Sequence, residues 1–124
     1  MKQRDVASVA ALLRDVVRAS EAILQVTAGM SFADYEIDDV RRWAVERQFT
    51  IVGEALGNAW KIDSTLDQKI SAVREIVGFR NILVHGYGGV RHEIVWDIIT
   101  NRVARLTNEV KALLATLPDP QTPA

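Results

Sequence analysis

Cysteine is absent from the 124-residue sequence, and several kinds of protein are excluded with it. Without thiols the chain cannot form disulfides, hold an Fe–S cluster, build a cysteine-based zinc site or use a thiol nucleophile. No uncharged run reaches the roughly 20 residues that a membrane helix needs, and the N-terminal residues lack the apolar core of a signal peptide. We therefore expect a cytoplasmic protein that does not associate with a membrane.

The sequence also lacks an excess of positive charge. It has 15 lysines and arginines against 16 acidic residues, a formal net charge of −1. Binding nucleic acid through bulk charge requires a basic surface, so any site for a polyanion must be local. Acidic residues gather at 34–39, whereas the segment 74–92 carries three arginines against one glutamate. Such a local excess would double in a dimer whose axis passes near it.

Apolar residues recur at helical spacing in four segments and nowhere alternate as in a strand. The first pattern can end at Gly29, the third stops at the glycines of 86–89, and the last ends at Pro118. The length suits one domain. The sequence therefore predicts an all-α, up-and-down bundle of four to five helices over residues 1–117, followed by a disordered tail at 118–124. The four segments are 6–24, 45–59, 73–84 and 94–117.

Local signals refine this outline. Ser31 with Asp34 three residues later is typical of a capping box, which predicts a short helical turn. Ser64 with Asp67 indicates a second, weaker one. Gly53 and Gly57 lie inside the second long helix, where each lowers helicity by about 1 kcal/mol relative to alanine. Small residues at this spacing indicate close packing of another helix.

The candidate chemistry lies at the end of the third helix. Four residues separate Arg80 from His85 there, and one residue separates His85 from Tyr87. On a regular helix His85 lies about 140° from Arg80, whereas Tyr87 returns to within roughly 20° of it. Arg80 and His85 of one chain therefore do not converge. Either the helix unwinds at Gly86, or a second subunit supplies the complement across a two-fold axis.

The run from Arg80 to Tyr87 resembles the signature of the HEPN superfamily, and specifically the HepT family of toxins paired with minimal nucleotidyltransferase antitoxins. Blocks at 29–32, 51–55, 74–81 and 93–99 are also similar to that family, in the same order. The resemblance implies a homodimeric helical bundle that cleaves RNA at a dimer-interface site without metal or cofactor and is silenced by its antitoxin. Members of the family differ in whether they retain nuclease activity.

The residue types suit that chemistry. Cleavage through the ribose 2′-OH needs a proton acceptor, a proton donor for the leaving 5′ oxygen and stabilisation of charge on phosphorus. Histidine can act in either proton transfer, which assigns His85 as acid or base. Arginine presents a planar fork to phosphate oxygens, so Arg80 is the expected phosphate clamp. Asn81 could hydrogen-bond ribose or orient His85, although a surface or packing role is equally consistent with its position.

Two further residues have alternative interpretations. The resemblance implies that the antitoxin transfers AMP to the Tyr87 hydroxyl, which would place a bulky anion beside Arg80; the alternative is a tyrosine that packs its ring against the helix. Glu54 is expected to be buried or capped and paired with an arginine, or else to support the catalytic cleft.

Other functions are weighed against these. His85, His92 and Glu93 match no zinc-binding spacing, so no metal site is predicted. The three tryptophans could anchor the core, anchor a dimer or stack on bases. The alternative to an enzyme is a non-catalytic HEPN binding module that docks or regulates a nucleotidyltransferase. The tryptophans are Trp43, Trp60 and Trp96.

Overall fold

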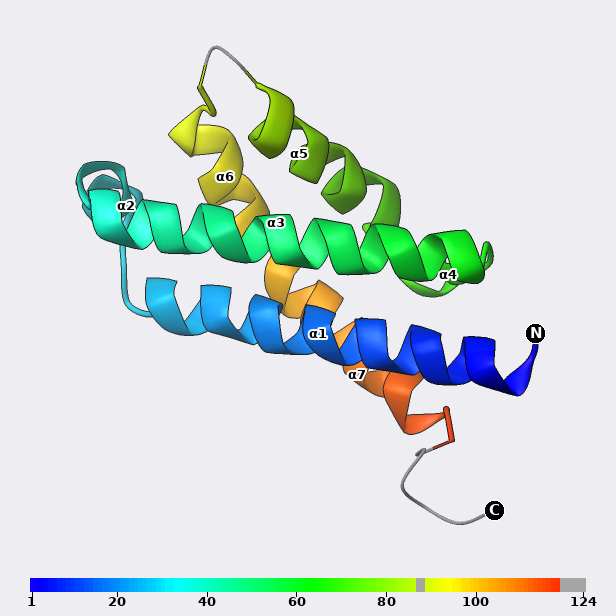
Figure 1. Cartoon of the computed structure of the whole chain (residues 1–124). Coiled ribbons are helices and arrows are strands. Elements are labelled where there is room, and N and C mark those ends of the chain that lie inside the picture. The colour runs from blue at the N-terminus through cyan, green and yellow to red at the C-terminus, as the bar shows by residue number, and fades with distance from the viewer. Residues whose placement is uncertain (87–88, 119–124) are drawn as a thin grey trace.

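The computed structural model describes residues 1–86 and 89–118 of the chain, and all regular structure in this part is helical (Figure 1). Four helices are long, and shorter ones connect or extend them. The prediction of an all-α protein is therefore confirmed. In chain order the elements are α1 (Gln3–Thr27), α2 (Phe32–Ile37), α3 (Asp39–Ile62), α4 (Leu66–Lys69), α5 (Val73–His85), α6 (His92–Ile98), the π-helical segment η1 (Ile99–Val103) and α7 (Ala104–Ala115).

The long helices α1 and α3 run antiparallel, side by side, and form the centre of the bundle (Figure 1). Helix α5 packs on α3, and α7 packs on α1. None of the described helices is both long and apolar enough to cross a membrane. The predicted domain limit at residue 117 stays a prediction, because most of the tail, residues 119–124, lies outside the described residues.

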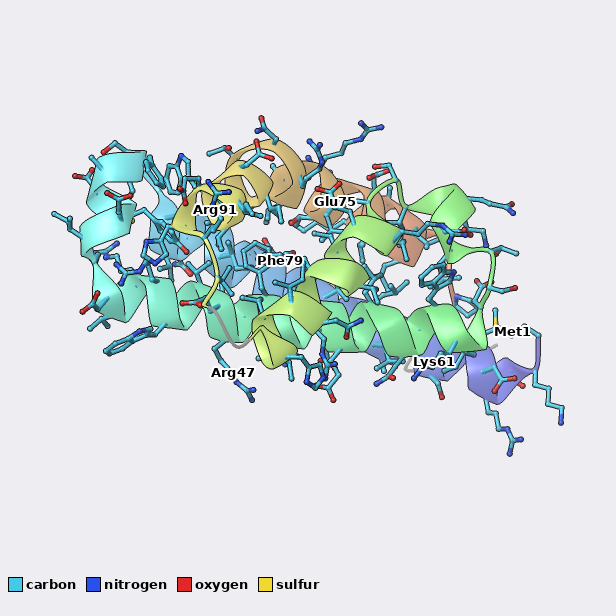
Figure 2. All side chains as sticks on the ribbon, turned by 90° about the horizontal axis from the view of Figure 1, so that it is seen from above. Met1, Arg47, Lys61, Glu75, Phe79 and Arg91 are labelled. Carbon is cyan, nitrogen blue, oxygen red and sulfur yellow. The ribbon has the colours of Figure 1, made fainter. Side chains whose placement is uncertain are left out.

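The core is made by the apolar faces that the helical spacing predicts. In α3, Val45, Phe49, Val52 and Leu56 are at most 1% exposed. The Phe49 ring meets Phe79 of α5 edge to face, with centroids 5.2 Å apart, and this contact joins the two helices. Figure 2 shows Phe79 pointing into the bundle, whereas Arg47 and Lys61 lie along the outer edge of α3. Helix α3 therefore has a buried face and an open face.

The turn between α1 and α2 forms as the sequence predicts. Gly29 adopts a φ of +76°, a conformation that other residues rarely adopt, and α1 ends just before it. The Asp34 N–H donates to the Ser31 hydroxyl at 3.1 Å, and the Ser31 N–H donates to the Asp34 carboxylate at 3.0 Å. These two hydrogen bonds form the predicted capping box, and they lower the pKa of the Asp34 carboxyl.

The last helical segment differs from the single α-helix that the sequence predicts. Between α6 and α7 the backbone widens into a π-helical segment, Ile99–Val103. The Thr100 hydroxyl donates to the Trp96 carbonyl at 2.9 Å there. A π segment accommodates an extra residue without ending the helix, so the apolar face continues through it. The apolar spacing alone does not reveal that local change.

Candidate active site

Helix α5 crosses α3 at an unusually close contact between Gly53 and Arg80. A Cβ atom placed on Gly53 would lie 2.2 Å from the Arg80 Cβ and 2.7 Å from its Cγ. Only glycine allows the arginine stem to lie directly on the α3 backbone. This contact confirms that Gly53 marks close packing of another helix. Gly57 is different, because a Cβ there would meet Val77 at 3.7 Å, which is ordinary van der Waals contact.

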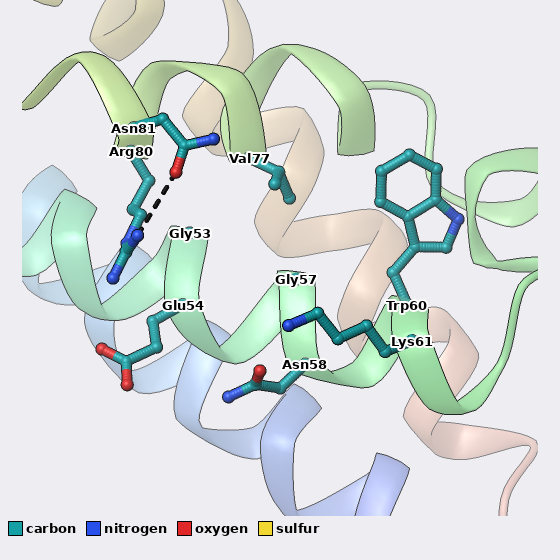
Figure 3. Close-up of a pocket in the computed structure, with 9 residues that line it drawn as sticks. All are labelled: Gly53, Glu54, Gly57, Asn58, Trp60, Lys61, Val77, Arg80 and Asn81. Carbon is teal, nitrogen blue, oxygen red and sulfur yellow. Dashed lines mark hydrogen bonds between the residues drawn. The ribbon is translucent and has the colours of Figure 1, made fainter. Parts of the chain in front are cut away.

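An open groove of about 510 Å³ follows the seam between α3 and α5 (Figure 3). Gly53 and Gly57 form its floor on α3, and Val77 closes its α5 side. The rest of its wall consists of polar and charged side chains of both signs and one tryptophan. The lining residues are Gly53, Glu54, Gly57, Asn58, Trp60, Lys61, Val77, Arg80 and Asn81. The groove therefore brings together three of the residues singled out in the sequence, Glu54, Arg80 and Asn81.

Arg80 lies at one end of this groove, and its guanidinium group has an N–H donor without a hydrogen-bond partner among the described residues. Its Nη1 donates to the Asn81 side-chain oxygen at 3.2 Å, while its buried Nε has no hydrogen-bond partner among the described residues. No ion pair to Arg80 occurs in the described part of the chain. A guanidinium in this state can still bind the oxygens of an anion, and Asn81 holds its orientation.

The Glu54 side chain departs from the expected buried pair with an arginine. Glu54 is exposed, and it forms no ion pair with Arg80 or with another described residue. It follows Gly53 by one residue, which turns it about 100° away from α5. The expectation that Glu54 pairs with an arginine is therefore wrong. Glu54 lies instead at the rim of the groove.

His85 is the last residue of α5, and its side chain is exposed. The Gly86 N–H donates to the Ile82 carbonyl at 2.8 Å, so the backbone stays helical through His85. Arg80 and His85 are consequently separated by about 140° around the axis and about 7.5 Å along it. One chain does not bring them together. Tyr87, the expected site of modification, lies outside the described residues.

The second histidine lies in a different environment. His92 is half-buried, with its ring edge-on to the buried Tyr35 at 6.4 Å between centroids. The neighbouring Glu93 carboxyl has a lowered pKa, chiefly because its own backbone N–H donates to it, with a smaller contribution from Arg91 at 3.5 Å. Within residues 1–86 and 89–118, no group of three or more histidine or acidic side chains is placed to hold a metal ion.

The three tryptophans prove to have different roles. Trp96 packs against Tyr35, with ring centroids 5.3 Å apart, and so belongs to the interior. Trp60 is half-buried under the Arg74 guanidinium, which lies 5.1 Å from the ring centroid and pairs with Asp67 at 2.9 Å. Trp43 is 63% exposed. Only Trp43 offers an open ring surface.

Sequence reasoning missed two groove residues, Asn58 and Lys61. Both are exposed and lie on the same face of α3 as Glu54, at steps of four and three residues. This spacing was visible in the sequence and could have located them once Glu54 was considered. What the sequence did not show is that this face borders Arg80.

The helical fold and the Arg80–His85 segment define a small helical domain of the HEPN class. The chain belongs to the HepT-like ribonuclease family, whose model, described as "Ribonuclease HepT-like", matches residues 16–113.

Several relatives are similar over most of their length. The chain is 33% identical over 104 residues to "Putative RNase TTE0752" of Caldanaerobacter subterraneus, covering 82% of this chain and 90% of the relative. It is 30% identical over 101 residues to "Probable ribonuclease HepT" of Thermococcus cleftensis, covering 82% and 91%. It is also 30% identical over 113 residues to "Putative RNase MJ1380" of Methanocaldococcus jannaschii, covering 90% and 98%. No solved structure matches the chain.

Proposed function

We propose that this protein is a metal-independent endoribonuclease toxin that acts as a homodimer and is silenced by a nucleotidyltransferase antitoxin. One observation carries the proposal: Arg80 lines an open groove and forms no ion pair with another described residue, and the same helix ends in an exposed histidine. The names of the relatives, which describe ribonucleases, support RNA as the substrate.

In this reaction one His85 takes the proton of a ribose 2′-OH, and the 2′ oxygen attacks the adjacent phosphorus. The P–O5′ bond breaks, and the second His85 donates a proton to the leaving 5′ oxygen. The products are a 2′,3′-cyclic phosphate and a 5′-hydroxyl end. Arg80 stabilises the negative charge that builds on the phosphate oxygens. Asn81 acts as a positioning residue through its hydrogen bond to Arg80, and Glu54 supports the rim of the site.

The divergence of Arg80 and His85 on one helix supports the proposed homodimer. A two-fold axis near the end of α5 places two copies of each residue around one cleft. Exposed apolar side chains flank His85 on this helix, namely Ile82 at 56% and Val84 at 44% exposure. Apolar groups of this size at a helix end are suited to cover one another in such an interface.

Silencing is proposed to occur through AMP attached to Tyr87. The family resemblance supports this assignment. A phosphodiester at Tyr87 would add negative charge next to the Arg80 clamp and fill the cleft. The measurement is intact-mass spectrometry of the protein after co-expression with a minimal nucleotidyltransferase. An AMP adduct that disappears in Tyr87→Phe is expected.

The enzymatic proposal is tested with purified protein, RNA and EDTA. Wild type should cleave RNA without added metal. His85→Ala and Arg80→Ala should each lower the cleavage rate by about 100-fold or more, because each removes a group that stabilises the transition state. Lys111→Gln, which removes an exposed positive charge on α7, is the control and should cleave like wild type. Equal cleavage by all variants would refute the proposal.

A second candidate function is a non-catalytic binding module. An exposed apolar surface on α2 and α3 favours it, with Ile37 82%, Val40 70% and Trp43 63% exposed. Apolar groups this open commonly dock another protein. Expression in a bacterial host separates the two candidates. Growth arrest that His85→Ala relieves supports the nuclease, whereas no arrest together with nucleotidyltransferase binding that Trp43→Ala abolishes supports the module.

A further inference from the structure

The groove extends beyond the catalytic pair, and its far end has no part in the chemistry proposed above. Gly53, opposite Arg80, and Lys61 at the far end are eight residues apart on α3, about 12 Å along the helix axis. Cleavage needs one phosphate at Arg80. The remaining length of the groove therefore needs another explanation.

The Lys61 side chain places its ammonium group in the groove between α3 and α5. Figure 3 shows the Lys61 side chain laid along α3 past Gly57, with its ammonium group toward the Arg80 end. Helical side chains lean toward the helix N-terminus, and Arg80 lies in that direction. Lys61 forms no ion pair in the described part of the chain. Arg74 differs, because Asp67 already neutralises it at 2.9 Å.

The floor of the groove at Gly57 is open although packing does not require glycine there. A Cβ at Gly57 would contact Val77 at 3.7 Å and 3.8 Å, without a clash. Alanine would therefore fit and would raise helix propensity. The missing methyl group instead leaves room between Lys61 and Arg80, at the middle of the groove.

We infer that this groove holds the RNA strand next to the cleaved bond, with Lys61 binding the phosphate adjacent to the one held by Arg80. Asn58 on α3 and Asn81 on α5 line the groove from different helices and offer amide groups to ribose or base edges. The groove carries two cations, Arg80 and Lys61, against the single carboxylate of Glu54, and this excess of positive charge suits a phosphodiester chain. This inference rests on the proposed nuclease function and assigns the strand-binding part of its site.

The test uses 2′-O-methyl RNA, which binds but cannot be cleaved because its 2′ oxygen is blocked. Affinity for a labelled hexanucleotide and for a dinucleotide is measured by fluorescence anisotropy at several salt concentrations. Lys61→Gln should weaken hexanucleotide binding about tenfold and reduce its salt dependence by roughly 0.7 in the log–log slope, as loss of one phosphate contact predicts. Dinucleotide affinity should stay within about twofold, because a dinucleotide reaches only the Arg80 end.

Gly57→Ala provides a second, independent test, because a loss of RNA binding in a variant of increased stability is not caused by a folding defect. This variant should unfold at a higher denaturant concentration than wild type and yet bind the hexanucleotide about fivefold more weakly. Gly78→Ala is the matched control, since Gly78 is an exposed α5 glycine with open space around it and lies outside the groove. It should gain stability without losing affinity. Lys111→Gln serves the same purpose for charge.

Two results would overturn the inference. One is hexanucleotide binding that remains at the wild-type level in both Lys61→Gln and Gly57→Ala. The other is AMP competing as well as an unlabelled hexanucleotide, which would assign the groove to a mononucleotide. Failure of the proposed function is distinguishable, because wild type would then leave unmodified RNA intact, whereas failure of this inference alone leaves wild-type cleavage unchanged.

Discussion

The Gly53 backbone and the Arg80 side chain occupy adjoining space so closely that a Cβ at position 53 would lie 2.2 Å from the Arg80 Cβ. Gly53→Ala should therefore push α5 away from α3. Overpacking of this kind costs about 1–3 kcal/mol, more than the helix propensity that alanine gains. Urea denaturation measures the loss. Cleavage should fall as well, because Arg80 moves with α5.

Gly78→Ala again provides the comparison for Gly53→Ala. Its added methyl group meets no atom within 4 Å, so only helix propensity should change. A gain of up to about 1 kcal/mol is expected. A Gly53→Ala protein as stable as the Gly78→Ala protein would contradict the close contact between α3 and α5.

The proposed dimer with one shared cleft predicts that an inactive chain lowers the activity of a wild-type partner. Wild type is refolded together with a ninefold excess of His85→Ala, so that subunits distribute at random. If both copies of His85 act in one cleft, activity per wild-type chain should fall to about one tenth, the fraction that finds a wild-type partner.

Lys111→Gln should itself be active, so the same ninefold excess of this variant should leave the activity per total chain unchanged. Undiminished activity in the His85→Ala mixture would show that each chain works alone. Sedimentation of the mixture checks that dimers have formed, and a monomeric wild type that remains active would reject the dimer.

Asp63 should make the free energy of unfolding decrease as the pH falls into the acid range. Its carboxylate accepts from the Thr65 hydroxyl at 2.6 Å and from the Thr65 N–H at 3.1 Å, and Lys69 lies 3.7 Å away. These contacts, the Thr65 hydroxyl first, hold the pKa of Asp63 below its usual value of 3.8. Because the folded pKa is the lower one, the stabilisation is complete above the unfolded pKa and is lost as pH falls through the folded value.

Asp63→Ala should consequently cost about 1 kcal/mol at pH 7, and its difference from wild type should narrow below about pH 4. Denaturation midpoints between pH 2.5 and pH 7 provide the measurement. Glu36→Gln, at an exposed carboxyl on α2, removes a charge without removing these hydrogen bonds and is the control. A difference that stays constant with pH would reject the assignment.

A buried hydroxyl pair links α1 to α7. The Thr107 hydroxyl donates to the Ser20 hydroxyl at 2.8 Å, and Ser20 in turn donates to the Val17 carbonyl at 3.2 Å. Both residues are at most 3% exposed. Thr107→Val should cost about 1 kcal/mol, and the double variant with Ser20→Ala should cost less than the sum of the single ones. Additive losses in denaturation experiments would show that the hydroxyls do not interact.

Much of this protein is determined by its sequence alone. The spacing of apolar residues shows which face of each helix is buried, because burial of one face repeats with the helix period. Ser31 and Asp34 define their own capping box, since both partners lie three residues apart. The pattern of Arg80 and His85 locates the candidate chemistry on one helix. Each of these features depends on neighbours within a few turns.

Only the tertiary structure determined the features that require contact between two helices. Gly53 and Arg80 are far apart in the sequence, and their close contact, together with that of Phe49 and Phe79, determines where α5 lies on α3. That contact opens the groove, leaves the Arg80 Nε without a partner and brings Lys61 into the candidate site. It also explains why Glu54 is exposed rather than buried with an arginine. The spacing within a helix specifies its buried face, but the angle and height at which another helix crosses it are set by packing between distant side chains.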